Sequence, residues 1–169
     1  PSAGNGSPPH LPGEMFKVMT KTNILHVPYK GTGQSIPDLL AGRHQLAFDT
    51  MPAASAYVRP GRMRALAVTS AKRVPDYANL PTVEEAGVPG YQMTTWYGVF
   101  APAGTPPAIV NRLHAELAKA IQAPGTRERL VENGFDGTVT NSPEEFAAMV
   151  RADIVRYAKL VKEAGLQLD

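Results

Sequence analysis

A glycine-rich turn at the start of the chain has the most chemical content. Gly4-Asn5-Gly6-Ser7 leads into two prolines and then into apolar residues at helical spacing. Glycines allow a ligand to approach the backbone closely, and the free N–H groups at a helix N-terminus attract an anion. The turn therefore predicts a cradle for a carboxylate or a phosphate. An ordinary helix cap formed by Ser7 after a tight turn would produce the same pattern.

Two further loops carry polar residues at similar places. Gly31-Thr32-Gly33 follows an apolar run over residues 24–27, and Asp49-Thr50 follows another over residues 45–48. In open α/β sheets, ligands bind beyond the carboxyl ends of the strands, so three such loops would form one wall of a cleft. Asp49 could accept hydrogen bonds from a ligand, or it could cap its own turn as an Asx motif.

The other reactive residues give little support for an enzyme. The chain has no cysteine, which excludes disulfides, zinc–thiolate sites and cysteine nucleophiles. No serine lies in a nucleophile elbow. No histidine has a spacing to another histidine or to a carboxylate that suits a metal, among His10, His26, His44 and His114. We therefore expect no catalytic residue, no metal and no cofactor.

Composition narrows the class of protein and its partners. A chain of 169 residues with 43% hydrophobic and 19% charged residues can form a folded core. No apolar run approaches the ~18 residues that cross a bilayer. The formal net charge of +2 is too small for a polyphosphate-binding surface, and the local basic clusters lack an aromatic stacking platform. We do not expect a nucleic-acid partner.

Short apolar runs alternate with helical patterns, which is typical of an α/β fold with parallel strands. The expected strands span residues 24–27, 45–48, 63–69, 94–101 and 136–140. Helices are expected after Ser7, after the Gly31-Thr32-Gly33 loop, after the turn Asp49-Thr50-Met51-Pro52 to near Arg59-Pro60-Gly61, from Thr82 to Gly87, after Pro106-Pro107, from Thr126 to Val131 and from Ser142 to Gly165. The helices beginning at Thr82 and Ser142 each open with a capping box.

Several longer motifs together resemble one family. They are Gly4-Asn5-Gly6-Ser7-Pro8-Pro9-His10, His26-Val27-Pro28-Tyr29-Lys30-Gly31, Phe48-Asp49, Arg64-Ala65-Leu66-Ala67-Val68-Thr69-Ser70, Pro81-Thr82-Val83-Glu84-Glu85-Ala86-Gly87 and Ala101-Pro102-Ala103-Gly104-Thr105-Pro106. Over essentially the whole chain they resemble the Bug or TctC family, the periplasmic solute receptors of tripartite tricarboxylate transporters. The resemblance implies a two-lobed, type II periplasmic-binding-protein (Venus-flytrap) architecture. Such a receptor captures a small carboxylate between its lobes and delivers it to membrane permease subunits; it is not an enzyme.

The resemblance also implies a division of the chain. Residues 1–93 look like most of the second, ligand-binding lobe, and residues 94–169 look like the crossover strand and C-terminal helices that complete the first lobe. Family members are longer and carry an N-terminal lobe segment that this chain lacks. We therefore expect a periplasmic fragment that self-associates or binds the missing N-terminal lobe segment, because its apolar helix faces need a cover.

Site residues follow from the matching motifs. By resemblance, the ligand carboxylate is held by the first loop, through Ser2, Ala3, Asn5, Gly6 and Ser7. Tyr29 and Thr32 lie beside the cleft, while Asp49 and Thr50 contact the ligand's polar end. The implied ligand is a di- or tricarboxylate, an acidic amino acid or an aromatic acid. The alternative is the effector-binding domain of a transcriptional regulator, which shares the fold; no helix-turn-helix is visible in the sequence.

Overall fold

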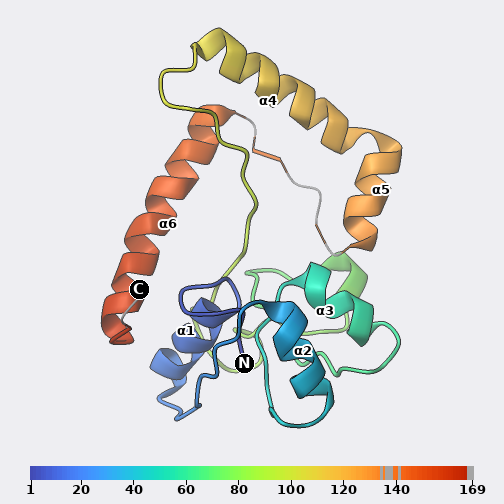
Figure 1. Ribbon diagram of the computed structural model, residues 1–169, viewed down its shortest axis with the longest axis vertical. Helices are drawn as coiled ribbons and strands as arrows, with labels where there is room; N and C mark the ends of the chain where they lie inside the picture. Colours follow the sequence, from blue (N-terminus) through green and yellow to red (C-terminus); the bar gives the residue numbers. More distant parts are fainter. Residues whose placement is uncertain (134, 136–138, 141, 167–169) are drawn as a thin grey trace. The chain divides into compact units, whose positions relative to one another are not determined.

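The computed structural model describes residues 1–133, 135, 139–140 and 142–166 (Figure 1). In chain order, its elements are α1 (His10–Thr20), α2 (Thr32–Leu40), α3 (Met51–Val58), the 3-10 helix η1 (Pro75–Tyr77), α4 (Pro107–Gln122), α5 (Pro124–Glu132) and α6 (Pro143–Glu163). Among these helices, none combines the length and the apolar character needed to cross a bilayer.

Two compact units make up the chain. The first comprises residues 1–95 together with the C-terminal stretch from residue 160, and the second comprises residues 96–159. All nine predicted site residues belong to the first unit. The assignment of residues 1–93 and 94–169 to two lobes of a receptor stays a prediction.

The expected strands do not form a regular ladder in the described residues. Two isolated parallel bridges are present, one between Ser2 and Pro28 and one between Val68 and Thr82. The parallel direction agrees with the prediction, but the predicted strands are wrong as continuous paired elements. The expected strand over 136–140 falls mostly outside the described residues.

Local geometry explains why each bridge ends after one pair. A continued ladder would direct the Gly4 N–H toward the Tyr29 carbonyl, but Gly4 has φ of 128° and its N–H donates to Ser2 Oγ at 3.1 Å. At the second bridge, the preceding bond of the ladder would need an N–H at residue 81, which is a proline. A backbone donor that is used within its own loop cannot extend a sheet.

Three helix boundaries differ from the sequence prediction. Helix α1 begins at His10 with Pro9 as its N-cap, and the Ser7 hydroxyl donates to the Gly4 carbonyl at 2.7 Å instead of capping the helix. Helix α5 begins at Pro124, before Thr126. The Thr82 capping box forms in both directions, yet it closes a turn and not a helix. Short segments such as these follow their surroundings more than their propensity.

The core of the first unit is small and centred on one tyrosine. Tyr91 is fully buried, and its hydroxyl donates to the Pro12 carbonyl of α1 at 2.8 Å. Phe16 meets the Tyr91 ring edge-on, with ring centroids 6.3 Å apart. Burial raises the pKa of Tyr91, so the hydroxyl stays protonated and keeps donating. These contacts hold α1, and with it the first loop, against the body of the unit.

The contribution of the Tyr91–Pro12 hydrogen bond to stability can be tested by substitution. The Tyr91→Phe variant should lower the free energy of unfolding by about 1–3 kcal/mol, because the buried Pro12 carbonyl loses its partner. Tyr77 is the matched control: its buried hydroxyl has no hydrogen-bond partner within the described part of the chain. Tyr77→Phe should therefore leave stability unchanged or raise it. Equal losses in the two variants, measured by urea denaturation, would contradict the assignment.

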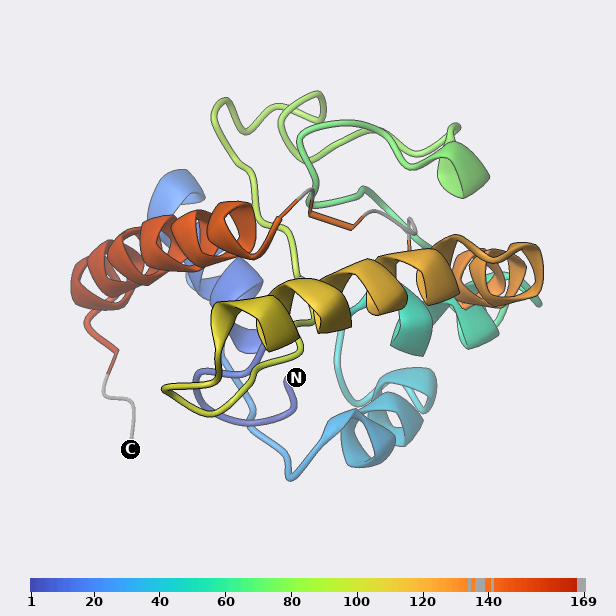
Figure 2. The same ribbon diagram turned by 90° about the horizontal axis from the view of Figure 1, so that it is seen from above.

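In the second unit, α4 and α5 meet at a sharp bend (Figure 2). Ala123 between them is extended, with φ of −59° and ψ of 133°. A residue before proline avoids the helical region, so Pro124 ends one helix and starts the next. Trp96 packs edge-on against Phe146 of α6, with centroids 5.2 Å apart, and its indole N–H donates to Asp153 at 2.7 Å. Trp96 therefore serves packing, as its residue type favours.

Candidate functional site

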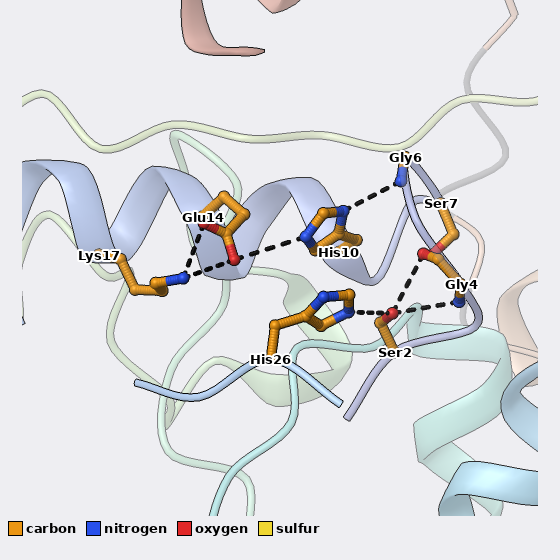
Figure 3. A network of polar contacts seen from close by, with 8 residues as sticks. All are labelled: Ser2, Gly4, Gly6, Ser7, His10, Glu14, Lys17 and His26. Atoms are coloured by element: carbon orange, nitrogen blue, oxygen red, sulfur yellow. Dashed lines mark hydrogen bonds and ion pairs between the residues drawn. The ribbon is translucent and has the colours of Figure 1, made fainter. Parts of the chain in front are cut away.

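The first loop, residues 1–7, is held in shape by its own polar groups (Figure 3). The Ser7 N–H and hydroxyl both donate to the Gly4 carbonyl, at 3.3 and 2.7 Å. Gly4 and Gly6 have φ of 128° and 69°, which are values that favour glycine. A Cβ added to Gly4 would lie 3.2 Å from the Tyr29 carbonyl oxygen. The loop thus has a defined conformation that depends on both glycines.

Ser2 fastens this loop to the segment that follows α1. Its N–H donates to the Val27 carbonyl and its carbonyl accepts from the Tyr29 N–H, both at 3.1 Å. The Ser2 side chain is 1% exposed, and its hydroxyl lies 2.6 Å from His26 Nε2. Ser2 was predicted as a ligand contact, but its side chain faces the interior of the unit. Its place in the structure is that of a structural anchor.

Few hydrogen-bond donors of the first loop lack an acceptor within the described residues. The N–H groups of Gly4, Gly6 and Ser7 are each used by a neighbouring protein atom. Within the described residues, the N–H groups of Ala3 and Asn5 and the side-chain amide of Asn5 make no hydrogen bond. Asn5 is exposed and Ala3 is partly exposed. Of the five residues predicted here, Ala3 and Asn5 therefore keep donors that an anion could use.

A cluster of two histidines and a glutamate lies behind the loop, and the sequence reasoning missed it. His10 and His26 stack with ring centroids 3.8 Å apart and an interplanar angle of 19°. Glu14 lies one turn along α1 from His10, with Oε1 3.4 Å from His10 Nε2. The expectation that no histidine–carboxylate spacing is suitable was wrong, because His10 and Glu14 are an i, i+4 pair that faces one side of a helix.

Tyr29 belongs to a second polar network. Its hydroxyl donates to Asp38 at 2.7 Å and lies 2.7 Å from His44 Nε2. Asp38 also pairs with Arg43 at 2.7 Å. The hydrogen bond to Asp38 raises the pKa of Tyr29 and lowers the pKa of Asp38. Because the hydroxyl is engaged in this network, Tyr29 supports the loops more directly than it offers a ligand contact.

Thr32, Asp49 and Thr50 lie at the starts of helices. Thr32 is the first residue of α2, and Thr50 is the N-cap of α3. Asp49 Oδ1 accepts the N–H of the adjacent Thr50 at 2.8 Å, whereas the predicted Asx motif would bond the N–H two residues on. Burial raises the pKa of Asp49. The second carboxylate oxygen of Asp49 makes no hydrogen bond with the described residues.

Two hollows bear on where a ligand could lie. A cavity of about 50 Å³ is bordered by the first loop, α1 and the segments that contain His26 and Phe48. Typical small-molecule pockets are about 300–1,000 Å³, so this one is too small to enclose a dicarboxylate. An open hollow of about 530 Å³ lies along α5. None of the nine predicted residues lines either hollow.

Comparisons with known proteins agree on one family. The family model described as "Tripartite tricarboxylate transporter family receptor" matches residues 1–166. A relative from Pseudomonas sp. (strain P51), "UPF0065 protein in tcbD-tcbE intergenic region", is 40% identical over 166 residues, which cover 98% of this chain and 49% of the relative. The chain thus spans about half the length of that curated relative.

Solved structures match with similar coverage. "R. palustris Rpa4515 with adipate" has a TM-score of 0.86 and 42% identity, covering 95% of this chain and 53% of that one. "Structure of periplasmic binding protein BugD" has a TM-score of 0.85 and 34% identity, covering 98% and 56%. The predicted α/β, periplasmic-binding-protein architecture is thereby confirmed, as is the resemblance stated from the motifs. The chain belongs to the family of tripartite tricarboxylate transporter receptors.

Proposed function

We propose that this chain carries one wall of the ligand site of an extracytoplasmic receptor that captures a small carboxylate. The receptor delivers this solute to the permease subunits of a tripartite tricarboxylate transporter. In this proposal the protein acts in the periplasm and catalyses no reaction, in keeping with a family of binding proteins. The family match does not favour the alternative role as the effector domain of a transcriptional regulator.

The first loop is the observation that carries this proposal. Its two positive-φ glycines direct three N–H groups inward to protein acceptors and leave the donors of Ala3 and Asn5 open. An unpaired donor beside glycine backbone is suited to a carboxylate, which only accepts hydrogen bonds. The adipate named with the 42% identical structure supports a dicarboxylate as the ligand class.

In this proposal, Asp49 determines the selectivity of the site among carboxylate ligands. It is the acidic side chain among the proposed loops, and one of its oxygens is already held by Thr50. Its other oxygen can accept a hydroxyl or ammonium proton from a ligand. Asp49 therefore favours ligands that carry a donor at the end remote from the first loop.

Calorimetric titration of the full-length gene product with a panel of acids tests the proposal. The panel contains adipate, a hydroxylated dicarboxylate such as malate, glutamate, benzoate and an uncharged diol. We expect saturable binding of at least one carboxylate and no binding of the diol. Binding that is absent for every acid, or equal for the diol, would overturn the proposed function.

The Asp49→Asn variant checks the selectivity step. Asparagine retains an oxygen for the Thr50 N–H, so the turn should keep its shape. We expect affinity for hydroxylated or amino acids to fall severalfold relative to plain dicarboxylates, because a charge-assisted hydrogen bond is lost. The same panel measures this ranking. A uniform shift across all acids would assign Asp49 a purely structural role.

A further inference from the structure

His10 is the first residue of α1, and its side chain lies between the first loop and Glu14, one turn further along the helix. Each ring nitrogen faces a different group. Nδ1 accepts the Gly6 N–H at 3.0 Å, whereas Nε2 lies 3.4 Å from Glu14 Oε1 and forms no hydrogen bond within the described residues (Figure 3). His10 is 4% exposed and Glu14 is 5% exposed. A backbone N–H can only donate, so Nδ1 must present a lone pair. The proton of the neutral imidazole is thereby placed on Nε2, on the side of Glu14.

A parallel connection runs through the stacked His26. Its Nε2 lies 2.6 Å from the Ser2 hydroxyl, which in turn accepts the Gly4 N–H at 3.1 Å. Each imidazole therefore holds one of the two positive-φ glycines of the loop, His10 directly and His26 through Ser2. Lys17 completes the first connection by contacting both Glu14 oxygens at 2.8 Å. The N–H of each positive-φ glycine is thus engaged by a side chain of this network.

The same cluster could be interpreted as a metal site, since one ligand atom from each of His10, Glu14 and His26 lies within 4.8 Å of the others. The hydrogen bonds argue against it. A metal on Nε2 of His10 requires the proton on Nδ1, where it would face the Gly6 N–H. Lys17 also occupies both carboxylate oxygens. The arrangement is therefore suited to holding a proton on one defined nitrogen.

We propose that His10 is a positioning residue for the first loop: as a neutral imidazole with its proton on Nε2, it holds Gly6 so that Asn5 faces outward. The loop's role in ligand binding rests on the proposed function above, whereas its conformation does not. The position of Asn5, one residue before Gly6, makes its open donors depend on the His10 contact.

Acid is expected to release this contact. A doubly protonated His10 would set an N–H against the Gly6 N–H. The charged groups that face the two rings are Glu14 and Lys17 of α1. Burial lowers the pKa of His10 despite Glu14. Burial and then the neighbouring His10 lower the pKa of His26 from 6.5 to about 4. Because the folded pKa values lie below the ordinary one of 6.5, the stability that the two neutral rings contribute is fully present above pH 6.5 and decreases as the pH falls below it. The folded His26 ring itself becomes charged near pH 4.

The test compares His10→Asn with His10→Leu in the full-length gene product. Asparagine offers Oδ1 at the place of Nδ1 and can still accept the Gly6 N–H, whereas leucine fills space without an acceptor. In the wild type at pH 7, imidazole ¹⁵N shifts should show the proton of His10 on Nε2. Hydrogen exchange of the Gly6 amide should accelerate roughly tenfold in His10→Leu and stay near wild type in His10→Asn. Adipate affinity should follow the same order.

The possible outcomes distinguish the positioning role of His10 from a metal site and from a failure of the proposed function. A proton on Nδ1 of His10 at pH 7, or equal Gly6 exchange in the two variants, would overturn the positioning role. Displacement of the Nε2 proton by stoichiometric Zn²⁺ would overturn it in favour of a metal site. If Gly6 exchange differs as expected but no acid of the panel binds even the wild type, the positioning role is supported and the proposed function fails. Glu14→Gln serves as a control, since it keeps an oxygen beside Nε2 and should preserve the tautomer.

Discussion

Replacing Gly4 with alanine is expected to lower the free energy of unfolding by about 1–3 kcal/mol and to weaken carboxylate binding at the same time. At φ of 128° an L-residue is strained, and the new Cβ would lie 3.2 Å from the Tyr29 carbonyl oxygen. Relief requires the loop to move away from Tyr29, which breaks the bridge that Ser2 makes with the segment after α1. Urea denaturation measures the stability, and calorimetry with adipate measures the binding.

Gly33 provides the matched control for this change. It lies in α2, has no positive φ, and a Cβ there would meet no atom within 4 Å. Gly33→Ala should therefore stabilise the chain by about 0.5–1 kcal/mol, because alanine has the higher helix propensity. If the two glycine variants had the same stability, the strain assigned to the first loop would not exist.

The Asn5→Ala variant should weaken the binding of adipate by roughly ten- to a hundredfold while leaving stability nearly unchanged. A hydrogen bond to a charged group contributes about 1.5–3 kcal/mol, and about 1.4 kcal/mol corresponds to a tenfold change in affinity. The Asn5 side chain is exposed and makes no hydrogen bond with the described residues, so its removal costs the fold little. Calorimetry and thermal denaturation give the two quantities.

Asn5→Asp separates a direct contact from an indirect one. It keeps the size of the side chain and places a negative charge where the ligand carboxylate is proposed to lie, so binding should weaken further than in Asn5→Ala. Wild-type affinity in Asn5→Asp would show that no anion approaches this residue. Ser7→Ala is expected to act more weakly and through the loop's conformation, since the Ser7 hydroxyl donates to Gly4.

The elements that could be predicted from sequence are those with strong local signals. Helix α6 begins at Pro143 and α4 at Pro107, as their prolines and apolar periodicity indicated. The Ser142 hydroxyl accepts the Glu145 N–H at 3.1 Å, as a capping box requires. Such helices carry most of their determinants within a few residues, so periodicity and caps suffice to locate them.

Strand pairing depends on residues that lie far apart, and there the prediction was only partly correct. Apolar runs identified the extended segments, but periodicity cannot show that a bridge stops after one pair. At the first bridge that outcome follows from the direction of the Gly4 N–H, whose acceptor is a side chain of the same loop and competes with the neighbouring strand. At the second bridge it follows from Pro81, which has no N–H to donate.

At the candidate site, too, the sequence indicated the local feature, the first loop, but not the distant residues that bond to it. Motif matching singled out the first loop, whose ligand role stays a prediction, and it did not distinguish donors that face outward from donors that bond within the unit. Gly6 and Ser2 illustrate this, because both were assigned to the ligand and both are bonded within the unit. Their partners, His10 and His26, are separated by 16 positions, and only the folded chain stacks them.

The way the first loop is braced has a consequence for how this receptor can diversify. Residues that set the loop's conformation, such as Ser2 and His10, are buried, whereas Asn5 projects from it without any bond to the described residues. A substitution at position 5 should therefore be nearly neutral for folding. Under the proposed function, single substitutions there would change the preferred solute without disturbing the fold, so selection could test them one at a time.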